Sequence, residues 1–240
     1  MSYKGSNILA VIPARGGSKG IPRKNLCKVG GISLVGHAVK TACSLDWIDR
    51  TIVSTDDEEI AAEGRKHGAT VPFMRPPELA SDQARSTDMW QQVWLASEDH
   101  FNESYDISIL LEPTSPLRRP QDILDTVDAL IDSGSDAAAT FSRAPAHFTP
   151  HKCLTLDEDG IIGFYHDQGQ QFSIRQKIPA YYYRNGICYA VRRHTLLEKG
   201  MIIEENCKAV IIERPVVNID DLHELEYAEF LWQKESRAQR

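Results

Sequence analysis

Short runs of apolar residues alternate along this chain with longer segments in which apolar residues recur every three or four positions. The apolar runs occupy residues 8–12, 51–53, 106–111, 136–141, 186–191 and 209–212. Continuous runs of this kind are typical of strands that are buried on both faces of a parallel sheet. The pattern therefore predicts an α/β fold built on a mainly parallel sheet.

Helical periodicity fills the segments that separate these runs. Predicted helices cover residues 34–42, residues 57–67, a segment that starts near 86, residues 120–131 and residues 221–231. Ser86, with Thr87 and Asp88, offers N-cap chemistry for the third of these helices. Pro120 suits the first turn of the fourth, where its missing N–H is not needed. The helices are therefore expected to flank the sheet.

The alternation breaks between about residues 143 and 184, a stretch rich in Pro, His and Tyr. An Asp-Glu-Asp-Gly sequence at 157–160 predicts a tight turn, so this stretch is expected to form a hairpin arm outside the sheet. Its apolar and aromatic residues have no second core to join: Phe148, Phe164, Tyr165, Phe172 and Tyr181 to Tyr183. Such side chains need a surface to bury against, which predicts a homodimer with the arm at its interface. Residues 1–240 are expected to form one domain, with the arm 143–184 inserted in it.

The composition narrows the classes of partner. With 240 residues, 42% of them hydrophobic, the chain can build one well-packed core. Its formal net charge of −7 argues against nucleic acid, which would require a basic face, but leaves room for a basic pocket that binds a small anion. No apolar stretch approaches the ~20 residues that span a bilayer, and five cysteines without a CxxC pair indicate reduced thiols. These features predict a cytoplasmic protein with no nucleic-acid or membrane partner.

The first predicted strand leads directly into a glycine-rich basic loop, Pro-Ala-Arg-Gly-Gly-Ser-Lys-Gly-Ile-Pro-Arg-Lys-Asn, at residues 13–25. Its glycines at 16, 17 and 20 let backbone N–H groups converge on an anion without Cβ clashes. Four cations accompany them and can neutralise a triphosphate: Arg15, Lys19, Arg23 and Lys24. The loop lacks the Gly-Lys-Ser/Thr ending of a P-loop and the GxGxxG spacing of a dinucleotide fold. The loop is therefore predicted to bind phosphates without belonging to either of these two motif classes.

Four further blocks follow this loop in order. They are Ser-Thr-Asp-Asp at 54–57, Arg-Pro-Pro-Glu-Leu-Ala-Ser-Asp at 75–82, Pro-Thr-Ser-Pro-Leu-Arg at 113–118 and Asn-Gly at 185–186. Together with residues 12–25, which match the signature IPARGGSKGIPxKN almost throughout, they resemble the CMP-sialic acid synthetases (N-acylneuraminate cytidylyltransferases). A tail block, Asn218-Ile219-Asp220, matches in part. The blocks span most of the chain, so the resemblance is specific.

This resemblance implies a mixed sheet of Rossmann-like appearance, with flanking helices and a small arm exchanged between the two subunits of a dimer. It implies a single nucleotidyltransferase domain that joins CMP from CTP to an acidic nine-carbon sugar of the sialic type and releases pyrophosphate. The nucleotide-binding residues that it implies are Ala14, Arg15, Gly16, Ser18, Lys24, Asn25, Arg75 and Ser86. In the sugar region it implies Lys152, Arg175 and Asn185. Such transfer depends on charge neutralisation and positioning more than on a protein nucleophile, so Arg15, Lys24 and Asp220 are expected to act in catalysis.

Two positions depart from the family pattern. Glu112 stands where the family has Gln before Pro-Thr-Ser-Pro, and Asn218 stands where the family's tail has the first Asp of Asp-x-Asp. The resemblance implies Mg²⁺, held by carboxylates and bridging the phosphates. Asp220 is the retained tail carboxylate and is expected to be the main metal ligand. Glu112 is expected either to help hold the metal or to bind the sugar.

The sequence leaves two alternatives open. The first is CMP activation of Kdo, or of legionaminic or pseudaminic acid, because Glu112 and the unusual segment 144–152 leave the substituents of the sugar undefined. His147 and His151 in that segment are candidates for a base, although loop histidines are more often solvated. The second alternative is a catalytically inactive nucleotide-binding regulatory protein. Asn218 favours it, and the intact phosphate loop argues against it.

Overall fold

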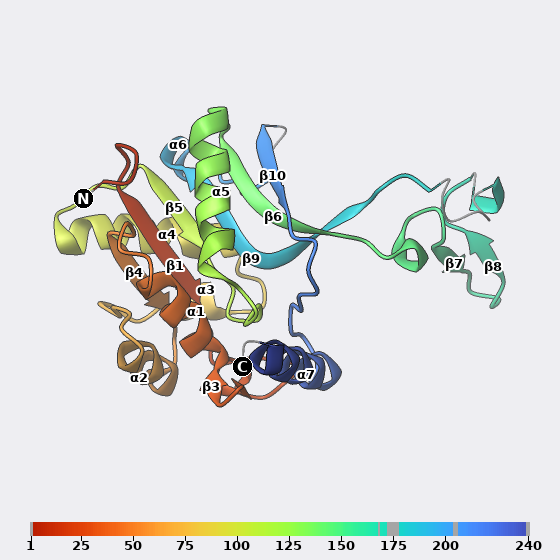
Figure 1. Cartoon of the computed structure of the whole chain (residues 1–240), viewed down its shortest axis with the longest axis horizontal. Coiled ribbons are helices and arrows are strands. Elements are labelled where there is room, and N and C mark those ends of the chain that lie inside the picture. The colour runs from red at the N-terminus through yellow and green to blue at the C-terminus, as the bar shows by residue number, and fades with distance from the viewer. Residues whose placement is uncertain (1, 168, 172–177, 204–205, 239–240) are drawn as a thin grey trace.

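A six-stranded mixed sheet forms the centre of the molecule in the computed structural model, which describes residues 2–167, 169–171, 178–203 and 206–238 (Figure 1). Its strands lie in the order β10 (Cys207–Ile211), β6 (Ala137–Arg143), β9 (Tyr182–Arg192), β5 (Ile107–Leu110), β1 (Ile8–Pro13) and β4 (Arg50–Ser54). β1 runs parallel to β4 and β5, and β10 runs parallel to β6. β9 runs antiparallel to both of its neighbours, β5 and β6. The predicted α/β fold with a Rossmann-like, mainly parallel sheet is confirmed.

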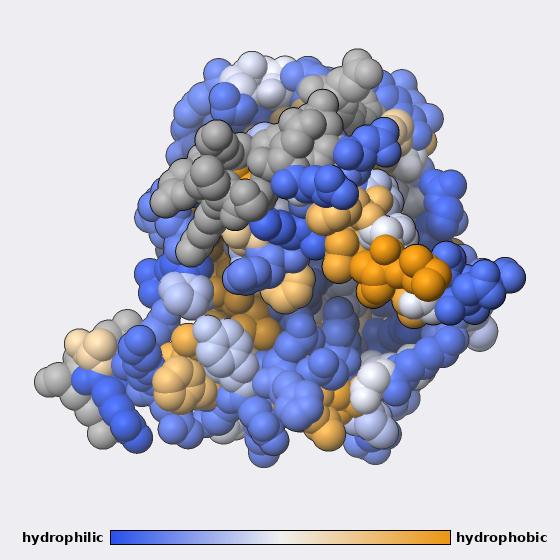
Figure 2. Space-filling view, turned by 90° about the vertical axis from the view of Figure 1, so that its right-hand side faces the viewer, coloured by the Kyte–Doolittle hydropathy of each residue, from blue (hydrophilic) through white to orange (hydrophobic). Residues whose placement is uncertain are grey.

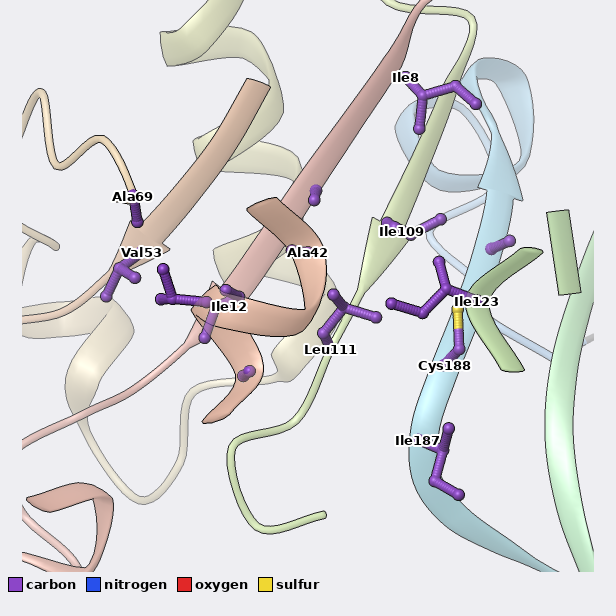
Figure 3. Packing of buried hydrophobic residues seen from close by; sticks show 14 of the residues in the cluster. Ile8, Ile12, Ala42, Val53, Ala69, Ile109, Leu111, Ile123, Ile187 and Cys188 are labelled. Carbon is purple, nitrogen blue, oxygen red and sulfur yellow. The ribbon is translucent and has the colours of Figure 1, made fainter. Parts of the chain in front are cut away.

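Helices cover both faces of this sheet. On one face lie α1 (Leu34–Cys43), α2 (Glu58–Lys66) and α5 (Pro120–Ser133), and on the other lie α4 (Ser86–Phe101) and α6 (Arg193–Leu197). Successive strand residues point to opposite faces, so Ile8 and Ile12 of β1 enter the first core whereas Leu9 and Val11 enter the second. Figure 3 shows part of the first core, where the side chain of Ile123 lies beside that of Cys188.

A third, smaller cluster attaches the C-terminal helix to the body. α7 (Leu222–Ala238) contributes Ala228 and Leu231, which pack with Val29 and Leu34. Val29 belongs to a two-stranded ribbon formed by β2 (Lys28–Val29) and β3 (Ile32–Ser33). Within the described residues, no helix has the length and apolar character that crossing a bilayer requires.

The predicted helices and strands are present, with ends that shift by a few residues. Asp57 caps α2, because its Oδ1 accepts hydrogen bonds from the N–H groups of Glu59 and Ile60. The predicted cap of α4 is wrong: Arg85 is the N-cap residue and Ser86 is the first residue of the helix. The sequence pattern also missed η1 (Lys24–Leu26), the β2–β3 ribbon and α3 (Pro77–Ala80), which are too short to show a period.

β6 and β9 lead into an arm that projects from the molecule (Figure 1). The arm holds η2 (Ala146–Phe148), β7 (Leu154–Leu156), β8 (Ile162–Phe164) and η3 (Gly169–Gln171). β7 and β8 pair antiparallel, and Gly160 donates to the carbonyl of Asp157 in the turn between them. The predicted hairpin is therefore confirmed.

Large apolar side chains of the arm are exposed in the single chain. They are Phe148, Leu154, Leu156, Ile161, Ile162, Phe164, Tyr165, Tyr182 and Tyr183. Figure 2, which looks onto the side from which the arm projects, shows hydrophobic side chains gathered at the surface. Phe172, which was predicted to join this set, lies outside the described residues.

Candidate active site

A cleft of about 530 Å³ opens beyond the carboxyl ends of β1 and β5. Open α/β sheets bind their ligands at this edge, because the loops that follow parallel strands meet there. The walls come from the loop after β1, from the segment 75–89, from the loop after β5 and from the tail before α7. Of the predicted site residues, the cleft is lined by Arg15, Ser18, Lys24, Asn25, Arg75, Ser86, Glu112 and Asp220.

The loop after β1 lines the cleft with cations that a carboxylate holds together. Arg15 Nη1 donates to Asp82 Oδ1 over 2.8 Å, and Lys19 Nζ lies 2.7 Å from Asp82 Oδ2. Hydrogen bonds from Lys19 and Arg15 hold the pKa of Asp82 below its usual range. Asn25 fixes the loop from beneath, since its Nδ2 donates to the carbonyl of Arg15 over 2.9 Å. The positive charge of the loop is therefore assembled before any ligand binds.

Lys24 connects this loop to the tail of the chain. Its Nζ donates to Asp220 Oδ1 over 2.8 Å and to the carbonyl of Ile219 over 2.9 Å. Gly20 packs directly on the tail, because a Cβ at this position would lie 2.2 Å from the carbonyl oxygen of Asp220. A larger residue at 20 would push the two segments apart. The first loop and the last sequence block thus form one continuous wall.

The block at 54–57 supports the same loop from the end of β4. The N–H of Gly16 donates to Asp56 Oδ1 over 2.9 Å. Arg23 Nη2 donates to both carboxylate oxygens of Asp57, over 2.9 and 3.0 Å. Ala14 is fully buried, and its N–H donates to the carbonyl of Ser54. Ala14 and Gly16 therefore hold the loop on the sheet, and their contact with a nucleotide stays a prediction.

Arg75 and Ser86 belong to the wall formed by the segment that follows α2 and by the first turn of α4. The guanidinium of Arg75 is anchored to the end of β4, since Nε donates to Ser54 Oγ over 3.0 Å and Nη2 donates to the Ser54 carbonyl over 2.6 Å. Burial lowers the pKa of Arg75 to about 10. Both residues line the cleft together with Arg85 and Met89. Their contact with the ribose or the cytosine stays a prediction.

Glu112 and Asn218, the two departures from the family pattern, are in direct contact. Asn218 Nδ2 donates to Glu112 Oε2 over 3.3 Å, and Asn218 Oδ1 is buried with no hydrogen-bond partner among the described residues. Burial raises the pKa of Glu112, and the nearby charge of Arg118 opposes this shift. Gly186, at φ +70°, lies against the same carboxylate, and a Cβ there would come within 2.2 Å of Glu112 Oε2. This corner of the cleft therefore presents oxygen acceptors that suit a hydrogen-bond donor or a cation.

Asn185 does not line the cleft but lies behind this corner. Its side chain is buried, with Oδ1 accepting from Thr140 Oγ1 over 2.6 Å and Nδ2 donating to Ser142 Oγ over 3.1 Å. β9 shifts register against β6 here, and Arg118 donates to the carbonyls of Gly186 and Ile187. Asn185 therefore shapes the irregularity of β9. Contact with a sugar stays a prediction.

Residues 9–237 match the family described as "Cytidylyltransferase". The chain belongs to the cytidylyltransferase family. It is therefore a CTP-dependent nucleotidyltransferase, and the family expected from the sequence blocks is confirmed.

Several named relatives of this cytidylyltransferase cover nearly its whole length. Pseudaminic acid cytidylyltransferase from Campylobacter jejuni is 29% identical over 225 residues, 93% of this chain and 95% of that protein. CMP-N,N'-diacetyllegionaminic acid synthase from Legionella pneumophila is 30% identical over 215 residues, 89% of this chain and 90% of that protein. N-acylneuraminate cytidylyltransferase from Streptococcus agalactiae is 32% identical over 197 residues, 80% of this chain but only 45% of that longer protein.

A solved structure supports the fold. CMP:2-keto-3-deoxy-manno-octonic acid synthetase, complexed with CTP, superposes with a TM-score of 0.71 at 20% sequence identity. The superposition covers 96% of this chain and 100% of that chain. At this identity the similarity establishes the common fold and carries no assignment of single residues.

Two predicted sugar-binding residues belong to the arm of the cytidylyltransferase. Lys152 follows η2 in the arm, which projects away from the body, and it does not line the cleft (Figure 1). Arg175 lies outside the described residues. His151, a candidate base, is buried in the arm, where its Nδ1 is 3.0 Å from the Tyr181 hydroxyl and its ring stacks on His166. A contact between these arm residues and a sugar in the cleft would need the cleft of a second copy.

Among the charged side chains that line the cleft, the structure adds Asp82 and Arg85 to those that the sequence analysis assigned, and it places Lys19 beside them. Lys19 was visible as one of the four cations of the loop. Asp82 is the last residue of the block at 75–82. Its negative charge was the one sequence feature that could have indicated a pairing with the cations of the loop. Its pairing with the loop depends on segments far apart in the chain, which a linear motif does not reveal.

Proposed function

We propose that this cytidylyltransferase joins CMP to an acidic nine-carbon 2-keto sugar of the nonulosonic, sialic-type class, consuming CTP and releasing pyrophosphate. The observation that carries the proposal is the cleft in which Arg15, Lys19 and Lys24 converge beside the partly buried Glu112–Asn218 pair. The relatives named for pseudaminic, legionaminic and N-acylneuraminic acids support the sugar class. Consumption of CTP, together with five cysteines that form no CxxC motif, fits a cytoplasmic enzyme.

The reaction is an attack of the anomeric hydroxyl of the sugar on the α-phosphate of CTP. The bond from the α-phosphate to the β-phosphate breaks, and negative charge accumulates on the departing pyrophosphate. Arg15 and Lys24, which line the cleft, would neutralise this charge, and Ser18 and the backbone of the loop would add donors. Arg75 and Ser86 line the wall where the nucleoside end would lie. Positioning and charge stabilisation therefore account for catalysis without a protein nucleophile.

The residues present fit a Mg²⁺ ion bound together with the nucleotide. Mg²⁺ is usually held by one or two carboxylates, substrate phosphates and water. Asp220 and Glu112 both line the cleft, and the buried Oδ1 of Asn218 is an oxygen without a hydrogen-bond partner in the described part of the chain. Within that part, no three acidic, His or Cys side chains form a closed metal cluster, so the phosphates would have to complete the ligand set. When bound, Mg²⁺ would supply charge neutralisation at the phosphates.

The arm supplies the reason to propose a homodimer. Its exposed apolar side chains need a partner surface, and its basic residue Lys152 is remote from the cleft of its own chain. In a two-fold dimer, each arm would bring Lys152 toward the cleft of the other subunit. The proposed sugar-binding residues are therefore Glu112 and Asn185 from one subunit and Lys152 and Arg175 from its partner.

A pyrophosphate-release assay over a matrix of nucleotides and sugar acids tests the proposal. The nucleotides are CTP, UTP, ATP and GTP, and the acids are N-acetylneuraminic, legionaminic and pseudaminic acid and the eight-carbon acid Kdo. We expect turnover with CTP and with at least one nine-carbon acid, and the pattern among the three defines the sugar substituents. Equal or better turnover with another nucleotide contradicts the proposal. Fastest turnover with Kdo assigns an eight-carbon substrate, and CTP binding without turnover on any acid assigns a regulatory role.

A further inference from the structure

The cations of the phosphate loop are already paired with carboxylates. Arg15 and Lys19 are paired with Asp82, Arg23 is paired with Asp57, and Lys24 is paired with Asp220. A triphosphate that binds to these cations must compete with the carboxylates for the same donors. The three carboxylates differ in the other structural contacts that each would have to give up if a nucleotide displaced it from its cation.

Asp57 has a second, structural role. Its Oδ1, which accepts from Arg23, also caps the N-terminus of α2. Asp220 is continuous with the tail, which Gly20 and the Lys24 bond to the Ile219 carbonyl hold in place. Asp82 has neither constraint. It lies in the loop between α3 and α4, and within the described part of the chain its carboxylate pairs with Arg15 and Lys19.

The geometry of Asp82 imitates a bound phosphate. One carboxylate oxygen accepts from Arg15 and the other lies against Lys19, so two oxygens of one anion bridge the two cations. The Asp82 side chain is 42% exposed, so it can return to water without crossing a buried environment. Ion pairs this exposed are individually weak. The contact is therefore strong enough to organise the cations and weak enough to be displaced.

We infer that Asp82 exchanges with the nucleotide phosphates on Arg15 and Lys19, and that its return helps to release pyrophosphate. The inference rests on the proposed role of the loop in binding the triphosphate. Asp82 is tethered to the same chain, so its effective concentration at the two cations is high and does not depend on free ligand. Pyrophosphate is held by the same cations after CMP transfer. A tethered carboxylate that competes for them favours its departure.

The test is the affinity of the enzyme for inorganic pyrophosphate and tripolyphosphate, measured by calorimetry with chelator present and again with Mg²⁺. Asp82→Asn removes the competing charge and keeps the shape of the side chain. We expect it to lower both dissociation constants by about three- to tenfold at low salt, because two weak exposed ion pairs no longer compete. The gain should shrink at high salt, where surface charges are screened. The inhibition constant of pyrophosphate in the reaction should fall in parallel.

Glu78→Gln is the matched control, because it removes the same charge from exposed α3 in the same segment. We expect it to leave both dissociation constants within about 1.5-fold of the parent. Asp82→Ser, which also removes the charge, repeats the test with a different side chain. A folded Asp82→Asn enzyme that binds polyphosphate as tightly as the parent, or less tightly, overturns the exchange and makes Asp82 a residue that only orders the cations.

Arg15→Ala separates this inference from the proposed function. If Arg15→Ala weakens pyrophosphate binding and Asp82→Asn does not tighten it, the loop binds phosphate and the exchange is wrong. If Arg15→Ala leaves pyrophosphate binding unchanged, the loop is not the phosphate site. In that case the proposed placement of the nucleotide fails together with the exchange.

Discussion

The cleft carries the proposed phosphate-binding residues and the arm carries proposed sugar-binding residues. The two regions differ in whether their side chains are already paired within one chain. In the cleft, charged side chains from distant parts of one chain are already paired, such as Lys24 with Asp220 and Arg15 with Asp82. In the arm, Ile162, Phe164 and Tyr165 are exposed, and Lys152 lies apart from the cleft. On the proposed function, the phosphate half of the site would lie within one chain, whereas the sugar half would use a second surface.

The difference follows from what each ligand requires. A triphosphate is recognised by concentrated positive charge and backbone N–H groups, which one loop with a few partners can supply. An acidic sugar carries a single carboxylate on a polyol, so its recognition depends more on enclosure and on hydrogen bonds in a dry environment. In the proposed dimer, the arm of the partner would supply this enclosure. The predictions below test this division, from the largest expected effect to the smallest.

Arg15→Ala should cause the largest loss, about 100- to 1,000-fold in kcat/KM, because it removes a charged donor whose contact strengthens as pyrophosphate departs. Steady-state kinetics with CTP and the best sugar acid give the value. Arg119→Ala is the control, since Arg119 is exposed and paired with Glu235 outside the cleft. A loss below about tenfold would place the phosphates elsewhere.

Asp220→Asn should lower kcat by at least about tenfold, with partial recovery at raised Mg²⁺, because the substitution removes the retained tail carboxylate. Manganese binding, followed by electron paramagnetic resonance in the presence of CTP, gives a readout that is independent of turnover. Unchanged manganese affinity would remove Asp220 from the metal site.

Glu112→Gln separates the two roles proposed for Glu112 and should have a smaller effect than Asp220→Asn. A weakened manganese affinity assigns Glu112 to the metal, and an unchanged affinity with a raised sugar KM assigns it to the sugar. Glu112 contacts Asn218, so the double variant Glu112→Gln/Asn218→Asp removes the carboxylate at position 112 and restores one at position 218. If the metal needs one carboxylate here, the double variant should recover most of what Glu112→Gln alone loses.

The arm is tested by subunit mixing. Arg15→Ala disables the cleft and Lys152→Ala disables the arm, so each homodimer should be poorly active. In an equal mixture that exchanges subunits, half of the dimers are mixed and each contains one intact site, so about a quarter of the parent activity should return. The absence of recovery, with exchange verified by mass spectrometry, would show that the arm serves its own cleft or none.

The interface itself is tested by Ile162→Asp, which places a charge among the exposed apolar side chains of the arm. Light scattering at micromolar protein should report a dimer for the parent and a monomer for the variant, because an unpaired charge cannot be buried in an interface without cost. A parent protein with a monomeric mass contradicts the proposed assembly.

Ser86→Ala should have the smallest effect, a rise of about two- to tenfold in the KM for CTP with little change in kcat, because it removes one neutral hydrogen-bonding group at the nucleoside end. Ser81→Ala is the control, because Ser81 also lines the cleft but its hydroxyl already donates to the carbonyl of Glu78. Equal effects of both substitutions would mean that Ser86 has no specific contact.

Much of the fold could be predicted from the sequence, and the failures have physical causes. β1 and α2 were predictable because apolar periodicity and a side-chain cap at Asp57 are local properties. The direction of β9 was not predictable, because an apolar run has the same pattern in a parallel and in an antiparallel strand. Ser86 was assigned as a cap because its residue type fits, whereas the chain enters α4 through Arg85.

For the candidate site as well, local features could be predicted from the sequence, whereas contacts between distant segments could not. The sequence by itself determined the phosphate loop, since Arg15, Lys24 and Asn25 lie within one short stretch whose glycines and cations are contiguous. It also determined the family, through blocks that are each local. Asn185 lay in such a block, yet only the structure showed that its amide forms hydrogen bonds with Thr140 and Ser142 behind the cleft.

Tertiary structure alone decided which side chains pair. It brought Asp82 to Arg15, Asp220 to Lys24 and Asn218 to Glu112, across separations that no linear pattern reports. It also left the arm outside the body, so that its apolar side chains remain exposed in the single chain. The physical reason is that propensity, capping and loop chemistry act between neighbours in sequence, whereas charge pairing and burial act between neighbours in space.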